Sequence, residues 1–278
     1  HTRSCRDWSS DVCSSDLKDD SATAGTESAD RSIRVLTWNV YADPAGHSQR
    51  IPALLRIVKD NNPDVIAFQE VADWFILSYI KDADALSGYH FARPTYDAPG
   101  GLAILSKFPV LRSEYRPLPT RMRRGALFAD IDTPDGPLTV ATVHLESFLE
   151  DGPIRAQQLG AVFDYLKTRA DACLTGDFNF GDGEEPDTSS IPLEYIDVWR
   201  ALKPDDPGLT WNIETSAMAK KNSFPDEPSR RLDRILIRSA RWSPVSIRII
   251  GDESLTAGGL FPSDHFGLVA SFVPTATK

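Results

Sequence analysis

After residue 30, apolar and polar residues first alternate along the chain, and apolar residues then recur at the spacing of a helix. Ile33 to Val40 alternates and is rich in β-branched residues, which is typical of a strand. Ser48 to Asp60 carries apolar residues at helical spacing, and Asp64 to Phe68 is a short apolar run after a break at Pro63. This pattern predicts strand, helix and strand, and we expect a second helix from Asp73 to Leu86.

Extended segments dominate the middle of the chain, where Pro and Gly separate one apolar stretch from the next. Several such segments follow one another, which favours antiparallel pairing. They are Gly101–Ser106, Val110–Pro117, Ala126–Asp132 and Leu138–His144. We expect a helix to open at Gly152-Pro153 and to lead into a strand at Ala172–Thr175. Later strands are expected at Leu232–Arg238, Val245–Ile250 and Phe266–Phe272.

This order of elements predicts the fold class. Helices alternate with strands early in the chain, whereas strands dominate its middle, and the apolar faces of such elements cover one another in layers. We expect an α/β fold, namely a four-layer α/β sandwich in which two packed mixed β-sheets are flanked by helices. No linker or repeat divides residues 31–278, so we expect them to form a single domain.

Residues 1–30 differ from the rest because they are polar and show neither helical nor strand periodicity. The segment from Cys5 to Leu17 repeats itself and resembles translated sequencing-adapter DNA. We therefore expect residues 1–30 to be disordered or artefactual and to lie outside the fold. No signal peptide is visible, so we expect a cytoplasmic location, but a missing true N-terminus would leave secretion open.

Composition restricts the partners of the protein. No apolar run among the 278 residues approaches the roughly 18 residues that a membrane span needs. A formal net charge of −10 argues against a broad duplex-binding surface, since such surfaces carry a basic excess. A small basic patch would still guide an anionic substrate. Three cysteines are too few and too scattered for a disulfide framework or a zinc cluster, and we expect a monomer.

Polar residues stand just past several apolar runs, where a rigid sheet can present side chains to a ligand. Taken singly, such residues are more often turn or cap residues than catalytic ones. Together they form six motifs in chain order: Thr37-Trp38-Asn39, Gln69-Glu70-Val71, His144-Leu145-Glu146-Ser147, Gly176-Asp177-Phe178-Asn179, Arg231-Leu232-Asp233-Arg234 and Phe261-Pro262-Ser263-Asp264-His265. In this combination the chain resembles the endonuclease/exonuclease/phosphatase superfamily over residues 33–272.

Within that superfamily the chain is similar to the 5′-tyrosyl-DNA phosphodiesterase type. The likeness rests on Ser147 in the third motif, on the segment Thr210-Trp211-Asn212, and on Phe261-Pro262 at the start of the last motif. The resemblance implies a metal-dependent hydrolase of nuclease type with a role in DNA repair. Its partner would be a phosphate-ester substrate at a single-stranded or 5′ end of DNA.

A carboxylate with nearby amide oxygens suits Mg²⁺, which prefers oxygen ligands and keeps several waters. We expect Glu70 to anchor this ion, and Mn²⁺ to be able to replace it. Asn39 is expected to hydrogen-bond a metal-bound water or a phosphate oxygen and is assigned to the same metal site. The family resemblance adds Asp264 as a further metal contact. The alternatives are a helix cap for Glu70 and an ordinary turn residue for Asn39.

Asp177 and Asn179 lie two residues apart, so both can point into one cleft. Asp177 can accept a proton from the attacking water, as a general base does. Asn179 can hold that water or the phosphate. The alternative for this segment is a plain Gly-Asp turn.

His144 and His265 can donate hydrogen bonds to the non-bridging oxygens of the phosphate, where charge develops in the transition state. Asp233 or Asp264 is expected to orient an imidazole and to keep it protonated. The residues alone leave both carboxylates open for this role. The family resemblance favours Asp233 as the partner of His265.

Four residues are candidates for contact with the substrate. Ser147 resembles a phosphate-contacting hydroxyl, because no nucleophile elbow surrounds it, and its alternative is an exposed loop serine. Arg123 and Arg124 belong to a compact basic run that would line an entrance for an anion, although a solvated strand face explains them equally well. Trp211 would stack on a base or an aromatic leaving group. Its alternative is core packing.

Three functions are consistent with these residues. The first is hydrolysis of a phosphodiester by direct attack of water, without a covalent enzyme intermediate. The second is a phosphatase or phosphodiesterase that acts on phospholipid headgroups or inositol phosphates, although no amphipathic membrane segment is visible. The third is a catalytically silent binding protein of the same fold, which would be expected to have lost some of the polar motifs.

Overall fold

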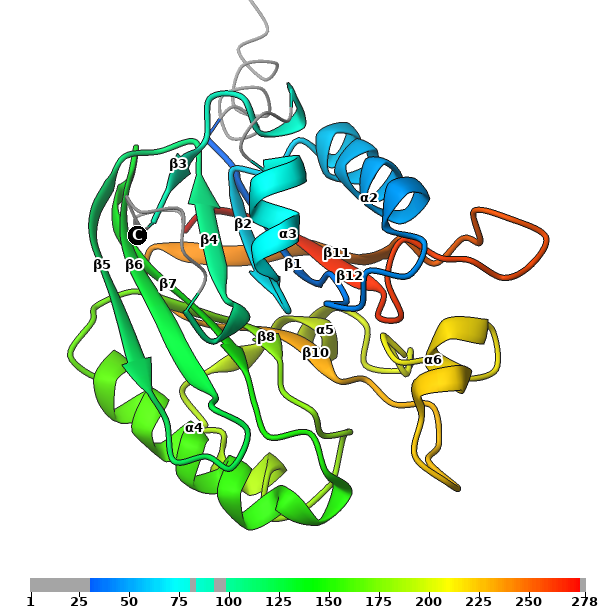
Figure 1. Ribbon diagram of the computed structural model, residues 1–278. Coiled ribbons are helices and arrows are strands. Elements are labelled where there is room, and N and C mark those ends of the chain that lie inside the picture. The colour runs from blue at the N-terminus through cyan, green and yellow to red at the C-terminus, as the bar shows by residue number, and fades with distance from the viewer. Residues whose placement is uncertain (1–30, 81–83, 93–98, 276–278) are drawn as a thin grey trace, which may run out of the picture.

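The computed structural model of the protein describes residues 31–80, 84–92 and 99–275 (Figure 1). The segment 1–30, for which the sequence predicts disorder or an artefact, lies outside the described residues. The strands form two six-stranded sheets whose strand orders interleave distant parts of the chain.

The first sheet has the order β11-β12-β1-β2-β4-β3. Its strands are β1 (Ile33–Asn39), β2 (Val65–Gln69), β3 (His90–Phe91), β4 (Ala103–Ser106), β11 (Trp242–Ile250) and β12 (Gly267–Pro274). The pair β1 and β2 is parallel because helix α2 (His47–Asn61) connects them, and the other neighbours are antiparallel. The sheet is therefore mixed, as predicted.

The second sheet has the order β5-β6-β7-β8-β10-β9. Its strands are β5 (Val110–Pro117), β6 (Gly125–Thr133), β7 (Gly136–His144), β8 (Ala172–Asp177), β9 (Ile196–Asp197) and β10 (Asp233–Arg238). Here the pair β7 and β8 is parallel, since helix α4 (Gly152–Leu166) crosses over between them. Each sheet thus contains one parallel pair of strands that is connected through a helix.

The layers are held together by three apolar clusters. Alternate residues of a strand face opposite sides of its sheet, so Val35 lies in the cluster between the two sheets and Leu36 in the cluster beneath α2. A third cluster packs Leu159 of α4 against Leu174 of β8. Figure 1 shows α2 and α3 (Asp73–Phe75) outside the first sheet and α4 outside the second. The predicted four-layer α/β sandwich is confirmed.

The structure differs from the sequence-based prediction between Asp73 and Leu86. The single helix expected there is replaced by α3, the π-helix η2 (Ile76–Ile80) and the 3₁₀-helix η3 (Asp84–Leu86). The wider π turn lets Tyr79 reach Nδ1 of His47 at 2.7 Å, and Phe75 stays buried against the sheet. The described residues of this segment are thus helical, in turns of three different types, and residues 81–83 lie outside the described residues.

Several short elements were not predicted. They are β3, β9, α5 (Val198–Leu202), α6 (Ala217–Asn222), η4 (Pro99–Gly101), η5 (Leu149–Asp151) and η6 (Thr188–Ser190). Segments of two to six residues are too short to show a periodicity, so the pattern of apolar positions does not reveal them. Among the helices that the structure describes, none is both long and apolar enough to cross a membrane.

Candidate active site

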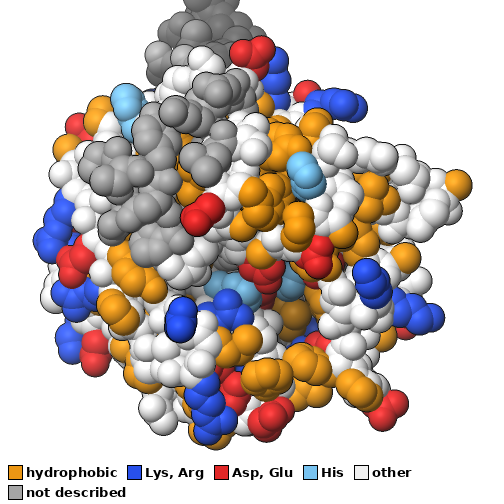
Figure 2. All heavy atoms as spheres, in the orientation of Figure 1, with side chains coloured by type: hydrophobic (Ala, Val, Ile, Leu, Met, Phe, Trp, Pro, Cys, Tyr) orange, Lys and Arg blue, Asp and Glu red, His pale blue; other side chains and the backbone are white. Residues whose placement is uncertain are grey.

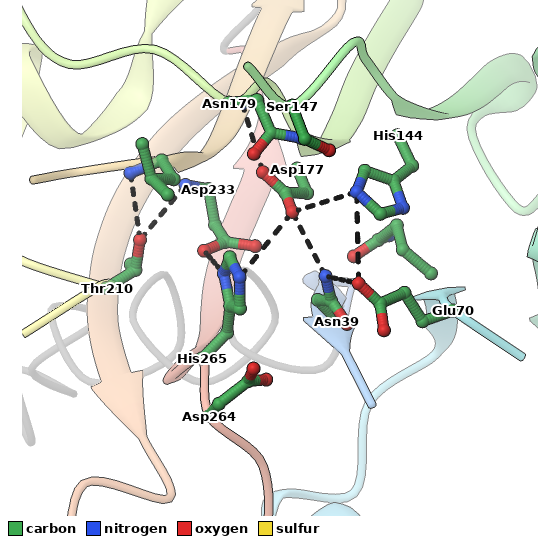
Figure 3. Close-up of polar contacts among 12 residues, drawn as sticks. Asn39, Glu70, His144, Ser147, Asp177, Asn179, Thr210, Asp233, Asp264 and His265 are labelled. Atoms are coloured by element: carbon green, nitrogen blue, oxygen red, sulfur yellow. Dashed lines mark hydrogen bonds and ion pairs between the residues drawn. The ribbon is translucent and has the colours of Figure 1, made fainter. Parts of the chain in front are cut away.

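The candidate residues come together where strand ends of the two sheets meet (Figure 3). In the second sheet His144 at the end of β7 is in register with Asp177 at the end of β8, and Asp177 is in register with Asp233 at the start of antiparallel β10. In the first sheet Asn39 is in register with the residue before Glu70. Figure 2 shows that this face of the molecule is hollowed near its centre, where acidic and histidine side chains lie.

Asp177 is the centre of the cluster. Its Oδ2 accepts a hydrogen bond from Nδ2 of Asn39 at 3.0 Å and lies 3.4 Å from Nε2 of His144 and 3.6 Å from Nε2 of His265. Its Oδ1 accepts the backbone N–H of Asn179 at 3.0 Å. Burial raises the pKa of Asp177 to about 6, although the charge of His265 opposes this shift. The carboxylate is therefore ionised at neutral pH and still basic enough to accept a proton.

Glu70 stands beside Asp177 on the neighbouring sheet. Its backbone is left-handed, with a φ of 58°, and this turn aims the carboxylate toward the cluster. Oε1 accepts from Nδ2 of Asn39 at 3.0 Å, and Oε2 accepts from the backbone N–H of Ala42 at 2.9 Å. The side chain is 27% exposed, whereas that of Asp177 is 1% exposed. Glu70 is thus held in place and remains accessible to a ligand.

His265 forms a pair with Asp233. Its Nδ1 lies 2.9 Å from Oδ2 of Asp233, and since a carboxylate only accepts, Nδ1 must donate. Burial alone would lower the pKa of His265, but the charges of Asp233 and Asp177 raise it well above its ordinary value. The hydroxyl of Thr210 accepts the backbone N–H of Asp233 at 3.0 Å, which fixes the start of β10. His265 is therefore a positively charged donor.

His144 is in the opposite state. Nη1 of Arg124 lies 2.8 Å from its Nδ1, and because guanidinium has no acceptor, this nitrogen of the imidazole must accept. Burial first, and then the charges of Arg124 and His265, lower the pKa of His144 well below its ordinary value. The proton of the neutral ring is consequently on Nε2, which points toward Asp177 and Glu70.

Ser147 and Asn179 complete the upper edge of the site in Figure 3. Oγ of Ser147 accepts from Nη2 of Arg124 at 2.6 Å and from Nδ2 of Asn179 at 3.3 Å, so its hydrogen is left to donate outward. Nδ2 of Asn179 also donates to the carbonyl of Leu145 at 3.0 Å. Both N–H groups of this amide are therefore used, which leaves its oxygen to accept a hydrogen bond.

Asp264 lies at the edge of the cluster rather than behind an imidazole. Its Oδ2 accepts from Nδ2 of Asn222 at 2.9 Å and its Oδ1 from the hydroxyl of Ser263 at 3.3 Å. Burial raises the pKa of Asp264 to about 6. Of the two carboxylates that the residues left open, the structure therefore places Asp233 against His265.

The structure separates the substrate-contact candidates. Arg124 reaches into the site, whereas its neighbour Arg123 is exposed at a left-handed φ of 61°. Trp211 is only 6% exposed, and its ring packs against the imidazole of His265 with centroids 4.8 Å apart. This is the core-packing alternative, because the ring offers little surface on which a base could stack.

Two residues of the site were missed by sequence reasoning. Thr210 belongs to a segment that carried the family resemblance, but nothing in that pattern indicated that its hydroxyl supports Asp233. Asn222 lies 42 residues before its partner Asp264 in an unpredicted helix, so no local signal points to it. Both act through contacts that only the tertiary fold creates.

The residues assigned to the metal site are only partly brought together. Nδ2 of Asn39 faces Glu70, while its Oδ1 accepts the backbone N–H of Tyr41 at 3.1 Å and is turned away. Asp264 is bound to Asn222 as described. Glu70 alone of these three presents partly open carboxylate oxygens, which are the ligands that Mg²⁺ prefers.

The whole cluster is rich in negative charge, which fits a divalent cation. Four carboxylates contribute to it. The charge of Glu70 acts on Asp177 and on Asp264, that of Asp233 acts on Asp177, and the charge of His265 interacts with the three aspartates. Among the described residues, ligand atoms of Asp177, Asp233 and His265 lie within 4.8 Å of one another and could hold a metal. In that group, however, the imidazolium of His265 already offsets the negative charge.

Comparisons with known proteins agree with this geometry. The sequence profile of the Endonuclease/Exonuclease/phosphatase family matches residues 36–265. Tyrosyl-DNA phosphodiesterase 2 of Danio rerio is 30% identical over 273 residues, which cover 94% of this chain and 72% of that protein. The human protein of the same name is 30% identical over 249 residues, covering 85% of this chain and 67% of its own length.

Solved structures show the same likeness. The crystal structure of the D. rerio protein complexed with a single-strand DNA product matches with a TM-score of 0.75 and 27% identity, over 87% of this chain and 98% of that chain. The catalytic domain of human nocturnin matches with a TM-score of 0.66 at 21% identity, over 88% of this chain and 95% of that chain, which shows the fold alone.

Proposed function

Because the chain belongs to the endonuclease/exonuclease/phosphatase family, we propose that it hydrolyses a phosphodiester at a single-stranded or 5′ end of DNA by direct attack of water. The chain is an enzyme of this family of metal-dependent hydrolases. One observation carries the proposal: the basic carboxylate of Asp177 faces a neutral imidazole and a charged imidazole, those of His144 and His265.

The attacking water is activated by Asp177. A carboxyl whose pKa is about 6 is ionised at neutral pH and can accept the proton that the water loses as it attacks phosphorus. The unused amide oxygen of Asn179 accepts the second hydrogen of that water and so fixes its orientation. Asn39 donates to both Asp177 and Glu70, and so holds the two carboxylates, which come from different sheets, at a fixed position relative to each other.

The phosphate is held by donors on three sides. The imidazolium of His265 offsets charge on a non-bridging oxygen, and the Nε2–H of His144 donates to the phosphate without adding charge. The free hydrogen of Ser147 donates from the upper edge. Arg124 contributes its guanidinium, which makes charge-assisted bonds to phosphate. No covalent intermediate is required, because none of these groups serves as a nucleophile.

We assign the metal of this site as Mg²⁺, for which Mn²⁺ can substitute. Glu70 holds it, since its carboxylate oxygens are partly open and stand beside the excess of negative charge. When bound, such an ion polarises a phosphoryl oxygen and offsets charge that develops on the leaving group. Asn39 supports it indirectly through its hydrogen bond to Glu70, and Asp264 through the negative charge of its carboxylate.

The preferred substrate follows from charge. At a net charge of −10 the protein gains little from many backbone contacts, so affinity depends on a few local ones. Arg124, which reaches into the site, can meet the scissile phosphate, and its exposed neighbour Arg123 can meet a flanking one. A free DNA end, which needs few contacts, suits this site better than an intact duplex. The structure of the D. rerio protein with a single-strand DNA product supports the preference for a DNA end.

We further propose that the enzyme works as a monomer in the cytoplasm. Every group assigned to the reaction comes from one chain, so no second copy is needed to complete the site. Cys173 is a free and buried thiol, which is compatible with a reducing compartment.

The test is a comparison of initial rates on a 5′-phosphotyrosyl oligonucleotide, bis-p-nitrophenyl phosphate, abasic duplex, sphingomyelin and an inositol polyphosphate in one Mg²⁺ buffer. We expect the oligonucleotide to be hydrolysed fastest. If the lipid or the inositol phosphate is hydrolysed at least about tenfold faster, which is about 1.4 kcal/mol of transition-state binding, the DNA assignment is wrong and hydrolysis itself stands. No turnover of any phosphate ester would instead indicate a silent binding protein.

A further inference from the structure

We propose that Glu146 and Thr120 act as positioning residues that hold Arg124 against the scissile phosphate. The proposal rests on the proposed role of Arg124 in binding phosphate. It accounts for a carboxylate that is fully buried beside the active site, at 0% exposure, and that the hydrolysis does not use. Glu146 lies two residues after His144 and one before Ser147, so it leaves the same strand end as the catalytic residues.

The carboxylate of Glu146 is held only by neutral donors among the described residues. Oε2 accepts from the hydroxyl of Thr120 at 2.8 Å and from Nε2 of Gln158 at 3.2 Å, and Oε1 accepts from the backbone N–H of Arg121 at 2.6 Å. A buried carboxylate is costly unless its oxygens are satisfied. The segment from Thr120 to Arg124 is thereby tied to one position relative to the end of β7.

Thr120 transmits this position to Arg124. While its hydroxyl donates to Glu146, the same oxygen accepts the backbone N–H of Met122 at 2.9 Å and that of Arg124 at 3.0 Å. The carbonyl of Arg124 in turn accepts the backbone N–H of Leu118 at 3.1 Å. The turn between β5 and β6 is closed around one hydroxyl, and the backbone of Arg124 is fixed on both sides.

The guanidinium of Arg124 needs such support because no carboxylate hydrogen-bonds it in the described structure, and the charges of Asp177, Glu70 and Glu146 act on it only from a distance. Its partners are Nδ1 of His144 at 2.8 Å and Oγ of Ser147 at 2.6 Å, with a longer contact to the sulfur of Met122. Its Nε is buried without a hydrogen-bond partner. A cation held in this way keeps its charge available for an anion, and its precise position depends on the backbone from which it extends.

A purely structural role for Glu146 is the competing explanation. Gln158 donates to the carbonyl of Pro119 at 2.8 Å as well as to Glu146, so the pair also ties α4 to the second sheet. Replacing Glu146 would disturb both functions at once. Thr120 is exposed, and among the described residues its hydroxyl hydrogen-bonds only Glu146 and the backbone of its own turn, which makes it the sharper place to test the proposal.

The experiment compares Thr120→Val, which removes the hydroxyl, with Thr120→Ser, which keeps it. Thr168→Val is the matched control, because Thr168 is also exposed and its hydroxyl donates to the carbonyl of Tyr165, its one hydrogen bond within the described part of the chain, near the end of α4. Rates are measured on bis-p-nitrophenyl phosphate, so that the result does not depend on the DNA assignment. We expect kcat/KM to fall about tenfold in Thr120→Val, and to stay near the wild-type value in the other two variants. The melting temperature of Thr120→Val should fall as well, because Glu146 loses a donor, so rates are compared at a temperature at which all variants are folded.

A double-mutant cycle with Arg124→Ala separates positioning from general disturbance. If Thr120 acts through Arg124, the double variant Thr120→Val, Arg124→Ala should be no slower than Arg124→Ala alone. The inference would be overturned if the fold-losses of kcat/KM in the two single variants multiplied in the double variant. It would also be overturned if Arg124→Ala were impaired while Thr120→Val kept full activity. Full activity of Arg124→Ala would refute the proposed phosphate contact, and the inference with it. Glu146→Gln, in which one acceptor oxygen becomes a donor, should show the same non-additivity with Arg124→Ala.

Discussion

The guanidinium of Arg124 donates a hydrogen bond to Nδ1 of His144 at 2.8 Å. Arginine cannot accept, so this contact fixes the neutral tautomer of the imidazole with its proton on Nε2. The other histidine of the site, His265, instead donates from Nδ1 to Asp233 at 2.9 Å and carries a positive charge. One site thus contains a neutral and a charged imidazole, and each has the form that its neighbours require.

This difference predicts two distinct histidine signals. We expect His144 to remain neutral and His265 to remain protonated between about pH 5 and about pH 8, the range in which an ordinary histidine titrates. The ¹⁵N chemical shifts of the ring nitrogens report both states. Arg124→Ala should raise the pKa of His144, because the cation lowers it in the wild type. Two histidines that both titrate near the ordinary value would contradict the geometry.

Metal dependence should reside in Glu70. We expect activity to vanish in excess EDTA and to return with Mg²⁺ or Mn²⁺, because the carboxylate supplies the protein's main ligand. Glu70→Gln keeps the shape of the side chain but removes its charge, so it should weaken the binding of Mn²⁺, measured by calorimetry. Asp252→Asn, at an exposed position in the loop after β11, is the control. Full turnover in EDTA would exclude a metal-dependent reaction.

Asp177→Asn should separate activity from stability. We expect kcat to fall at least about 10²-fold with little change in KM, as befits the loss of a general base. In the same variant, the stability in metal-free buffer should lose part of its dependence on pH. The folded state raises the pKa of Asp177 from 3.8 to about 6, so the protein loses stability as the pH increases through this window and the carboxylate forms. An amide does not titrate, so Asp177→Asn lacks this loss with pH, although its NH2 group faces the donors of Asn39 and His265 and lowers its stability at every pH.

Relative to Asp177→Asn, the wild type should therefore lose melting temperature, by about 2 to 4 °C per kcal/mol, as the pH rises to neutrality from about 3, where its carboxyl is largely protonated in both states. In the active wild type, kcat/KM should increase with pH through about 6 as the base ionises. A variant that unfolds, or that keeps the wild-type kcat, would show that Asp177 is a structural turn residue.

Much of the fold could be predicted from the chain because its strands are long and their apolar pattern is regular. Asn39 and His144 were found for the same reason, since each directly ends an apolar run. The register of the parallel pairs then places these strand ends side by side, so that polar residues that follow different apolar runs lie next to one another. Local pattern was therefore sufficient for the framework of the site.

Local pattern was insufficient where tertiary contacts decide. Arg123 and Arg124 are adjacent and chemically identical, yet the turn around Thr120 directs one to solvent and the other to His144. Trp211 was expected either to stack on a base or leaving group or to pack in the core, and the ring against which it packs, that of His265, is distant in sequence. No spacing rule within a segment contains that information.

The sequence also left open whether Asp233 or Asp264 supports an imidazole, and the structure makes the two experimentally separable. Asp233 bonds Nδ1 of His265, whereas Asp264 bonds Asn222. We expect Asp233→Asn to lower kcat at least about 10²-fold, because His265 loses the carboxylate that orients it and keeps it charged. The matched variant, Asp264→Asn, should lose less activity, since it leaves this pair intact.

The pH dependence gives the sharper distinction. The charge of Asp233 is the main factor that raises the pKa of His265, so Asp233→Asn should lower this pKa. Its remaining activity should then decline as the pH rises through neutrality, where the wild type and Asp264→Asn keep a protonated His265 and stay level. The ¹⁵N shift of His265 measured over the same range must follow the loss of activity. A decline in Asp264→Asn and not in Asp233→Asn would show that Asp264, after all, holds the proton on the imidazole during the reaction.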